Sequence, residues 1–466
     1  MWTALSSFKT ITPIDGSVYV ERTRHADEDI DRALARANAA AISWARTSVP
    51  DRTQILSRAV DSLVASASTV AEEITWQIGR PIKDSPGELR GFVERARHML
   101  EIAPTALADV VSAPKPGFER FIERRPLGTV VVLAPWNYPF LTAVNAIIPA
   151  LAAGNTVVLK HSEQTPLASE RLSQAFQASG LPQGIFQHLH IDHDQVARMI
   201  ADPRVAFVSF TGSVQGGHAV QRALASGFTA SGLELGGKDS AYIRDDADLK
   251  DAVANVADGV FFNAGQSCCA VERIYAHRRV YREVVDGLVA FAEQLRLGDP
   301  RDPSTTLGPM VRPQAADWVR GQVAAAIEAG ARALVDRARF PLDKPGGAYL
   351  APQIVVDCDH SMPLMTEETF GPVVGVMAVS SDEEALSLMN HSRYGLTASI
   401  WTSDVNAARA MGARLDTGTV FLNRCDYLDP ALAWAGVKDS GRGCTLSPLG
   451  YEQLTRPRSF HFRLPA

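Results

Sequence analysis

Residues 129–139 read TVVVLAPWNYP, and this stretch decides the fold class. A β-branched run over 129–134 predicts a buried strand, and the apolar segment at 140–152 predicts a helix directly after it. The elements expected next are strands at 156–160, 185–190 and 205–210 and a helix at 166–178. Strands that alternate with helices predict a parallel sheet with right-handed crossovers, which binds its ligands at the carboxyl ends of the strands.

The rest of the chain is also of α/β character. Helical periodicity dominates the first hundred residues, and residues 118–124 alternate like an exposed strand. A second α/β region follows Gly237. The helices expected outside the first series are 26–49, 51–78, 88–107, 248–262, 281–295, 312–329, 381–390 and 406–415, and the strands are 351–356, 373–379, 398–401 and 420–423. The tail at 455–464 alternates weakly and is expected to form an edge strand.

Composition limits the class of protein. The 466 residues are too many for one core, and about 150 residues per domain predicts two to four domains. The 46% apolar and 21% charged fractions are ordinary for a globular protein. A net charge of −6 and a pI near 6.0 do not suggest a nucleic-acid partner. Five cysteines without regular spacing argue against a disulfide framework and favour a reducing compartment.

The sequence shows no targeting or membrane segment. The first residues, MWTALS, lack a basic region followed by an apolar core, so they do not read as a signal peptide. The most apolar stretch, 141–153, is shorter than the ~20 residues that a membrane span needs, and it contains Asn145 and Pro149. We therefore expect a cytoplasmic protein without a membrane partner.

Residues 262–269, FNAGQSCC, contain the candidate nucleophile Cys268. An ordinary thiol has a pKa near ~8.5 and is only a few per cent thiolate at pH 7, so a catalytic cysteine needs an activating environment. Gly265 and Gln266 suit a backbone bend that opens onto a helix N-terminus, which would favour the thiolate. The side chain of Cys269 is expected to point away and to serve packing.

Two further polar residues complete a candidate catalytic set. Glu234 opens the segment ELGGK, whose glycines allow close approach of a ligand. A thiol and a carboxylate base together are what covalent acyl chemistry needs. Asn137 follows the strand at 129–134, where its amide could donate to an oxyanion together with the backbone N–H of Cys268. Without the other motifs, a purely structural role for Asn137 in its turn carries similar weight.

These motifs, in this order, resemble those of the aldehyde dehydrogenase superfamily, of the NAD(P)-dependent, hydrolytic, non-CoA-acylating type. The resemblance runs from about Ile11 to the C-terminus and includes EETFGP at 367–372, NHSRYGL at 390–396 and WAGVKDSG at 434–441. It implies that Cys268 attacks an aldehyde, that hydride transfer leaves a thioester, and that Glu234 activates the water that releases the acid. Relatives that acylate coenzyme A generally lack this carboxylate.

The resemblance also implies a nicotinamide dinucleotide cofactor. The segment FTGSVQGG at 210–217 lies between an expected strand and an expected helix, as a pyrophosphate turn does, although alone it is weak evidence. The implied cofactor-binding residues are Trp136, Lys160, Ser162, Glu163, Gly212, Ser213, Gly217, Leu235, Gly236, Glu368 and Phe370. Glu163 would repel a 2′-phosphate, which favours NAD, while His161 beside Lys160 adds positive charge and leaves NADP open.

The implied fold is α/β, with a Rossmann-like cofactor domain, an α/β catalytic domain and a small strand-rich oligomerisation element. These would comprise residues 1–110 and 127–235, residues 236–440, and residues 111–126 and 441–466, respectively. An edge strand in the tail is unsatisfied alone, so a homodimer or homotetramer is expected. The residues expected to line the aldehyde pocket are Tyr138, Thr142, Ser267, Cys269, Leu428 and Trp434. In the loop RCDYLD at 424–429, the acids favour an amino-aldehyde and Arg424 favours an acid semialdehyde, so the substrate stays open.

Two other readings compete with this one. Residues 188–193, HLHIDH, resemble the metal-binding signature of metallo-β-lactamase-like hydrolases, in which His188, His190, Asp192 and His193 would hold zinc. No clear set of downstream ligands accompanies this motif, and it follows an expected strand, so no metal is expected. The third reading is a catalytically silent structural relative, which the intact Cys268, Glu234 and Asn137 argue against.

Overall fold

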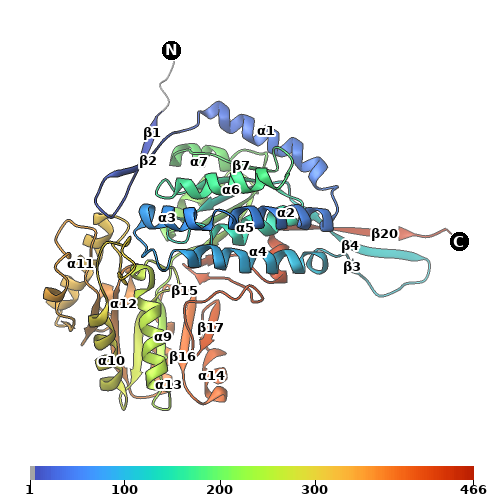
Figure 1. Cartoon of the computed structure of the whole chain (residues 1–466). Helices are drawn as coiled ribbons and strands as arrows, with labels where there is room; N and C mark the ends of the chain where they lie inside the picture. Colours follow the sequence, from blue (N-terminus) through green and yellow to red (C-terminus); the bar gives the residue numbers. More distant parts are fainter. Residues whose placement is uncertain (1–5, 466) are drawn as a thin grey trace.

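The computed structural model describes residues 6–465, which form two parallel sheets with flanking helices and a projecting three-stranded arm (Figure 1). The first sheet has the strand order β19-β9-β8-β5-β6-β7, and β19 alone runs antiparallel. Its strands are β5 (Thr129–Ala134), β6 (Thr156–His161), β7 (Phe186–His188), β8 (Val205–Thr211), β9 (Ala230–Glu234) and β19 (Gly441–Arg442). The predicted parallel sheet is therefore confirmed.

Alternation along β5 explains why helices cover both faces of this sheet. Val130 and Val132 pack into one core, whereas Val131 and Leu133 pack into the other, so neither face can be left to water. The first core contains α2 (Val49–Val64), α3 (Ala67–Ile78), α4 (Pro86–Ala106), α5 (Ala143–Ala152) and α6 (Pro166–Ala178). The second contains α1 (Asp27–Trp44), α7 (His193–Ile200) and α8 (Val214–Leu224).

The second sheet repeats this layered plan. Its order is β12 (Arg332–Ala333), β13 (Gln353–Val356), β14 (Val373–Val379), β11 (Val271–His277), β10 (Asp239–Ile243), β16 (Thr397–Trp401) and β17 (Thr419–Leu422). One face packs against α9 (Leu249–Phe261) and α10 (Tyr281–Gln294). The other packs against α11 (Pro313–Glu328), α12 (Pro363–Thr366), α13 (Asp382–Asn390) and α14 (Val405–Gly412).

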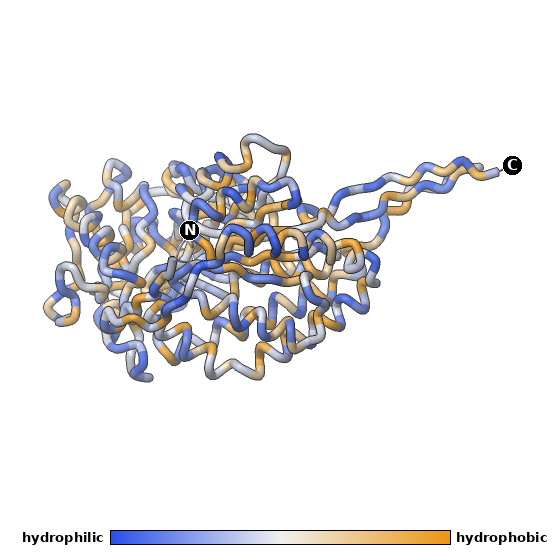
Figure 2. The backbone as a smooth tube through the Cα atoms, turned by 90° about the horizontal axis from the view of Figure 1, so that it is seen from above, coloured by the Kyte–Doolittle hydropathy of each residue, from blue (hydrophilic) through white to orange (hydrophobic). Residues whose placement is uncertain are grey.

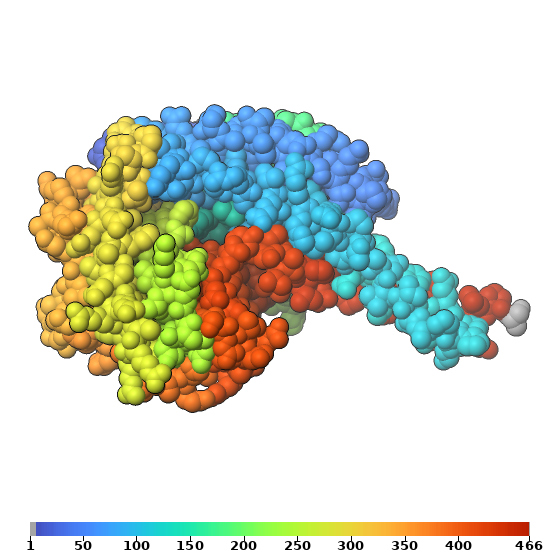
Figure 3. Space-filling view, turned by 60° about the horizontal axis from the view of Figure 1, so that its bottom comes forward, coloured from blue at the N-terminus to red at the C-terminus, as the bar shows by residue number. Residues whose placement is uncertain are grey.

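The arm extends well beyond both sheets (Figures 2 and 3). It consists of β3 (Val110–Val111), β4 (Phe118–Pro126) and β20 (Thr455–Arg463), and β4 and β20 pair antiparallel along their whole lengths. Phe121 stacks on Phe460 across the ladder with ring centroids 4.5 Å apart. Such cross-strand aromatic pairs stabilise a thin sheet that lacks a covering helix. The strand expected in the tail is thus confirmed.

Some local predictions fail for identifiable reasons. The helical pattern over 51–78 is two helices, α2 and α3, separated near Ala65. The hairpin of β1 (Ser7–Ile11) and β2 (Val18–Thr23) was not predicted, and neither were β9, β10 and β11. The two-residue strands β15 (Tyr394–Gly395) and β18 (Val437–Lys438) pair with each other. Among residues 6–465, no helix is long and apolar enough to cross a membrane.

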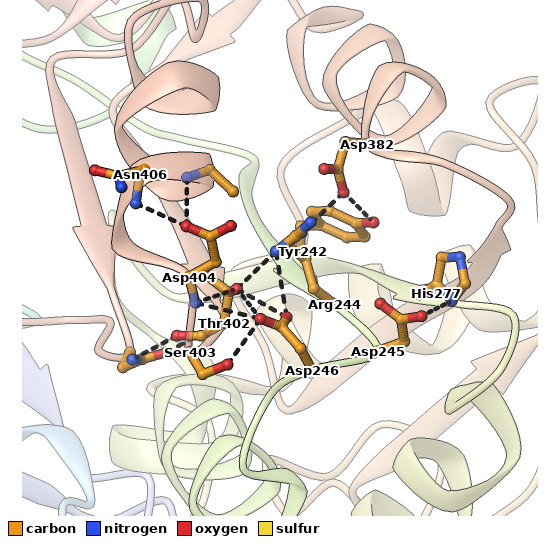
Figure 4. A network of polar contacts seen from close by, with 12 residues as sticks. Tyr242, Arg244, Asp245, Asp246, His277, Asp382, Thr402, Ser403, Asp404 and Asn406 are labelled. Carbon is orange, nitrogen blue, oxygen red and sulfur yellow. Dashed lines mark hydrogen bonds and ion pairs between the residues drawn. The ribbon is translucent and has the colours of Figure 1, made fainter.

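A closed polar network occupies the carboxyl end of β10 and β16 (Figure 4). Arg244 Nε and the hydroxyl of Tyr242 donate to Asp382 Oδ1 at 3.0 and 2.9 Å. The hydroxyl of Thr402 donates to Asp246 Oδ2 at 2.7 Å, and Asp404 caps the N-terminus of α14. These charged and hydroxyl groups are therefore satisfied by one another, whereas Nε1 of the buried Trp401, the last residue of β16, has no hydrogen-bond partner within the described residues.

Candidate active site

Cys268 lies in a sharply bent segment that precedes β11. Asn263, Ala264 and Gly265 all have positive φ, and a Cβ on Gly265 would lie 2.2 Å from the carbonyl oxygen of Gly371. Only glycine fits that close approach. The expectation that a helix begins after Cys268 is wrong, because a turn leads directly into a strand that starts at Val271. A helix dipole therefore does not activate this thiol.

The expectation that the side chain of Cys269 points away is wrong, because Cys269 lines the same cavity as Cys268. The Cys269 thiol is buried and donates to Asp426 Oδ1 at 2.9 Å. A hydrogen bond with the Cys268 thiol, burial and the nearby Asp426 carboxylate all raise the pKa of Cys269 well above its usual range. Cys269 therefore stays protonated near neutral pH and does not compete as a nucleophile, since the thiolate is the reactive form.

Glu234 ends β9, at the carboxyl edge of the first sheet. Its two carboxylate oxygens accept hydrogen bonds from the hydroxyls of Thr445 at 2.5 Å and Thr211 at 3.2 Å. Burial raises the pKa of Glu234, while these hydroxyls lower it less. A carboxyl group with a raised pKa is a stronger base once ionised, so the arrangement suits general-base work.

Asn137 follows β5 and is 5% exposed. Its amide Nδ2 donates to the carbonyl oxygen of Gln266 at 3.2 Å, which brings it against the segment of Cys268. The carbonyl oxygen of Asn137 accepts from Arg80 Nη2 at 2.5 Å, and Arg80 forms a buried ion pair with Glu88 at 2.5 Å. Sequence reasoning did not find this buried pair, which fixes the loop that carries Asn137.

The first cavity contains every residue predicted for the aldehyde pocket. It has a volume of about 370 Å³, and its lining includes Cys268 and Glu234. The predicted residues that line it are Tyr138, Thr142, Ser267, Cys269, Leu428 and Trp434. Of the loop at 424–429, Asp426, Tyr427 and Leu428 line this cavity. Arg424 instead stacks on Tyr427, 3.5 Å from the ring centroid, and Asp429 caps the backbone N–H of Ala431.

The second cavity adjoins the first at Cys268 and Glu234, which line both spaces. Its lining contains the predicted residues Trp136, Asn137, Gly212, Ser213, Leu235, Gly236, Glu368 and Phe370. A Cβ on Gly236 would lie 2.1 Å from Glu368 Oε1, so a larger residue here would displace the Glu368 side chain. Burial raises the pKa of Glu368 to about 8. The Ser213 side chain caps α8 through Gly216 N.

The third cavity shares Trp136, Val311 and Arg312 with the second. It contains the predicted residues Lys160, Ser162 and Glu163. Gly217 lines none of the three cavities and instead packs on Leu235. The expected positive charge on His161 is wrong, because burial lowers its pKa to about 4 and its ring bonds Pro139 and Thr165.

Arg95 was missed by the sequence reasoning and lines the first cavity. It lies on the buried side of α4 at core spacing, next to Phe92 and Ala96. Its Nη1 donates to Leu141 O at 2.6 Å and Asn145 Oδ1 at 3.3 Å, and within residues 6–465 it forms no ion pair. Burial lowers its pKa. An arginine at a core position of an amphipathic helix was the available signal, since buried charge is costly without a partner.

The HLHIDH segment does not form a metal centre. His190 Nε2 contacts Glu170 at 3.1 Å, Asp192 caps α7 through Gln195 N at 2.9 Å, and His193 is the first residue of α7. In the described part of the chain, no group of three or more His, Cys, Asp or Glu side chains is placed to hold a metal ion. The zinc-hydrolase alternative therefore receives no support.

Comparison with known proteins identifies the family. The family model described as "Aldehyde dehydrogenase family" matches residues 2–460. The succinate semialdehyde dehydrogenase [NAD(P)+] Sad of Escherichia coli is 34% identical over 92% of each chain, and a succinate-semialdehyde dehydrogenase [NADP(+)] of Mycobacterium avium is 34% identical over 95% of this chain and 93% of its own.

Solved structures agree with the sequence comparison. The betaine aldehyde dehydrogenase of Staphylococcus aureus, solved in complex with NAD+, has a TM-score of 0.92 at 28% identity and covers 98% of this chain and 92% of its own. The chain belongs to the aldehyde dehydrogenase family. It is an NAD(P)-dependent enzyme that oxidises an aldehyde to the carboxylic acid.

Proposed function

We propose that Cys268 is the nucleophile of this aldehyde dehydrogenase, with Asn137 as an oxyanion donor and Glu234 as the base of the hydrolytic step. One observation carries the proposal. Cys268 and Glu234 line both the first and the second cavity, so the thiol and the carboxylate can act on a substrate that enters from one side and a cofactor that lies on the other. The remaining roles follow from this division.

The chemistry proceeds in two halves. The thiolate of Cys268 forms a bond to the carbonyl carbon as the carbonyl π bond breaks, and the amide of Asn137 turns from Gln266 O to the oxygen that becomes negative. The dinucleotide, when bound, would supply the hydride acceptor, and loss of hydride from that carbon would leave a thioester on Cys268. Glu234 then takes a proton from water, whose oxygen attacks the thioester carbon. The carbon–sulfur bond breaks, the acid leaves, and the thiolate of Cys268 is regenerated.

The second and third cavities would hold the dinucleotide. Gly236, which lets the backbone approach Glu368, suits the nicotinamide ribose beside Phe370. Trp136 and the N-terminus of α8 at Ser213 suit the pyrophosphate, because a helix N-terminus attracts anions. Lys160 and Glu163 suit the adenosine ribose in the third cavity. The predicted residues Gly212, Leu235 and Ser162 line the same two cavities, whereas Gly217 serves packing.

For the substrate, we propose an aldehyde with an anionic tail, held by Arg95. The guanidinium lines the first cavity and uses only Nη1 for protein contacts, so its other donors remain for a ligand. Two of the relatives are named succinate semialdehyde dehydrogenases, and that substrate carries a carboxylate. Arginine binds carboxylates through paired hydrogen bonds that are stronger than neutral ones. The polar loop at 424–429 supplies no competing cation, because Arg424 lies on Tyr427.

We further propose a cytoplasmic homo-oligomer whose subunits join through the arm. The five cysteines are free, which fits a reducing compartment. Both outer strands of the arm are open edges, and each carries an exposed apolar side chain, Val111 on β3 and Phe462 on β20. The proposed domains are residues 1–110 and 127–235 for the cofactor and 236–440 for catalysis, with the arm for assembly. Light scattering after size exclusion tests the assembly, and a monomer would contradict it.

Pre-steady-state kinetics tests the catalytic roles. After rapid mixing with aldehyde and NAD, Glu234→Gln should release one equivalent of NADH per site in a burst and then turn over about 10²–10³ times more slowly than the unaltered enzyme, because hydride transfer precedes the step that needs the base. Cys268→Ala should show neither burst nor turnover. The matched control Cys425→Ala should keep both. A burst that survives in Cys268→Ala would refute the proposed nucleophile.

A further inference from the structure

The third cavity carries more positive than negative side chains. Four cationic residues line it, and the acids on its wall are Glu163 and Asp192. The cations are Lys9, Arg24, Lys160 and Arg312. This balance contrasts with the chain as a whole, whose net charge is −6. Local accumulation of one sign in a concave site raises the affinity for ligands of the opposite sign.

Glu163, which alone would repel an anion, is already paired. Arg24 contacts its Oε1 through Nε at 2.9 Å and through Nη2 at 2.8 Å. Arg24 follows β2 and is itself anchored, because its Nη1 donates to the carbonyl oxygen of Ser7 at 3.0 Å. The hairpin of β1 and β2 thus delivers a fixed guanidinium to the loop after β6. The carboxylate charge of Glu163 is neutralised at close range.

The second acid of this cavity is engaged as well. Asp192 is the N-cap of α7, and its Oδ1 accepts from Gln195 N at 2.9 Å. A carboxylate at a helix N-terminus is offset by the positive end of the helix dipole. Both acids of the third cavity therefore have favourable partners within the protein.

Lys160 is the opposite case. It lies near the end of β6, burial lowers its pKa, and within residues 6–465 its ammonium group has neither a hydrogen bond nor an ion pair. An ammonium group carries three donors. This cation faces a space whose acids are both occupied.

Resting on the proposed function, which places the adenosine ribose here, we propose that Arg24 determines cofactor selection: by neutralising Glu163, it lets Lys160 and its neighbours accept a 2′-phosphate, so that the enzyme binds NADP as well as NAD. The expectation that Glu163 repels a 2′-phosphate and so favours NAD would then hold only for an unpaired carboxylate. Without Arg24, the carboxylate of Glu163 would face the phosphate directly. The 2′-hydroxyl of NAD carries no charge and would be much less affected.

The chain offers a matched control in the same segment. Arg22 lies two residues before Arg24 and forms an ion pair of the same type with Glu170 of α6, at 2.7 Å. Arg22 does not line the third cavity. If Arg24 served only to hold the hairpin against the first sheet, its replacement would change the affinities for NAD and NADP equally, and replacement of Arg22 would do the same.

Calorimetric titration with 2′,5′-ADP and 5′-AMP tests the proposal without catalysis, and it is run in the unaltered protein and in Cys268→Ala. Because these ligands differ only in the 2′-phosphate and no aldehyde is present, failure of the proposed catalytic roles does not affect the result. Arg24→Gln should weaken the affinity for 2′,5′-ADP about tenfold or more, as expected for loss of one charged partner. The affinity for 5′-AMP should change less than about threefold. Arg22→Gln should change the affinity for neither ligand.

A double variant that also removes the repelling charge of Glu163 gives the decisive experiment. In Arg24→Gln/Glu163→Gln, affinity for 2′,5′-ADP should recover most of the loss seen in Arg24→Gln, because the carboxylate is gone. Equal weakening of both ligands in Arg24→Gln, or no recovery in the double variant, would overturn the proposal. So would failure of the unaltered protein to bind 2′,5′-ADP. Thermal melts of all variants establish that each is folded.

Discussion

The two sheets of this enzyme end in opposite ways at their carboxyl edges. In the first sheet, the residues after β5, β6, β8 and β9 surround three connected cavities. In the second sheet, Arg244 and Thr402 follow their strands and bond to Asp382 and Asp246 (Figure 4). Both edges are at the position where open α/β sheets bind ligands. Topology alone therefore does not make a site.

The difference lies in which polar groups already have partners. Arg244 has its charge matched by Asp246 and Asp382, whereas Arg95 at the first sheet has only neutral acceptors. Lys160 is similarly unpaired within the described residues. A buried polar group that lacks a partner is costly, so such groups concentrate where a ligand completes them. This comparison can be tested by changing one group at each edge.

Among the tests of this comparison, the largest effect is expected at Asn137. Replacing it by alanine removes one proposed oxyanion donor, so kcat should fall about 10²–10³-fold. Steady-state NADH formation measures this, and a thermal melt shows that the fold persists. If kcat stays within threefold of the unaltered enzyme, Asn137 stabilises the turn after β5 and takes no part in the reaction.

A smaller and selective effect is expected for Arg95→Met. With succinate semialdehyde, kcat/KM should fall about 10- to 150-fold, because a charged hydrogen bond contributes about 1.5–3 kcal/mol. With butanal, which has the same chain length and no carboxylate, it should change little. Arg90→Met is the matched control, since Arg90 lines the same cavity but is exposed. Equal losses with the two aldehydes would assign Arg95 to holding the loop at Leu141.

The closed edge should respond in stability and not in catalysis. Asp382→Asn weakens the bonds from Arg244 and Tyr242, and it should cost about 1 kcal/mol of unfolding free energy at this partly exposed position. Urea denaturation measures that cost. The value of kcat/KM should stay within twofold. A large loss of activity in this variant would mean that the second edge also contributes to the site.

The smallest effect concerns pH. Burial raises the pKa of Asp426 in the first cavity to about 7. The carboxyl group is neutral below that pH and negative above it, so KM for an anionic aldehyde should rise about threefold between pH 6 and 8. Asp426→Asn should remove this rise. If that variant instead raises KM for amino-aldehydes specifically, the cationic-substrate hypothesis is favoured over the anionic one.

Sequence reasoning found the parts of the site that depend on local pattern. The β-branched strand at 129–134 and the glycine turns around Cys268 and Glu234 have local physical signatures, and the structure brings their neighbourhoods together around shared cavities. The assignment of catalytic roles remains a prediction. Sequence reasoning missed the features that depend on residues distant in the chain. These are the Arg80–Glu88 ion pair, the partner of Glu163, and the strand that replaces a helix after Cys268.

These misses share a physical cause. A charged residue on a helix looks the same in sequence whether it faces water or a cavity, as Arg95 shows. The expected charge of His161 failed for the same reason, because burial decides its protonation and burial is a tertiary property. Polar residues at core spacing are therefore the signal to examine first in related sequences.

The pairing of β4 with β20 has a consequence for biosynthesis. Phe118 pairs with Arg463, and Asn155 donates to Leu454 O, 299 positions away in the chain. When the residues of both sheets have been synthesised, the nascent chain still lacks the pairing of β4 with β20. Until residues 455–463 emerge, β4 presents unpaired backbone groups, and such an edge invites pairing with other nascent chains. Emergence of residues 455–463 therefore closes this open edge of β4.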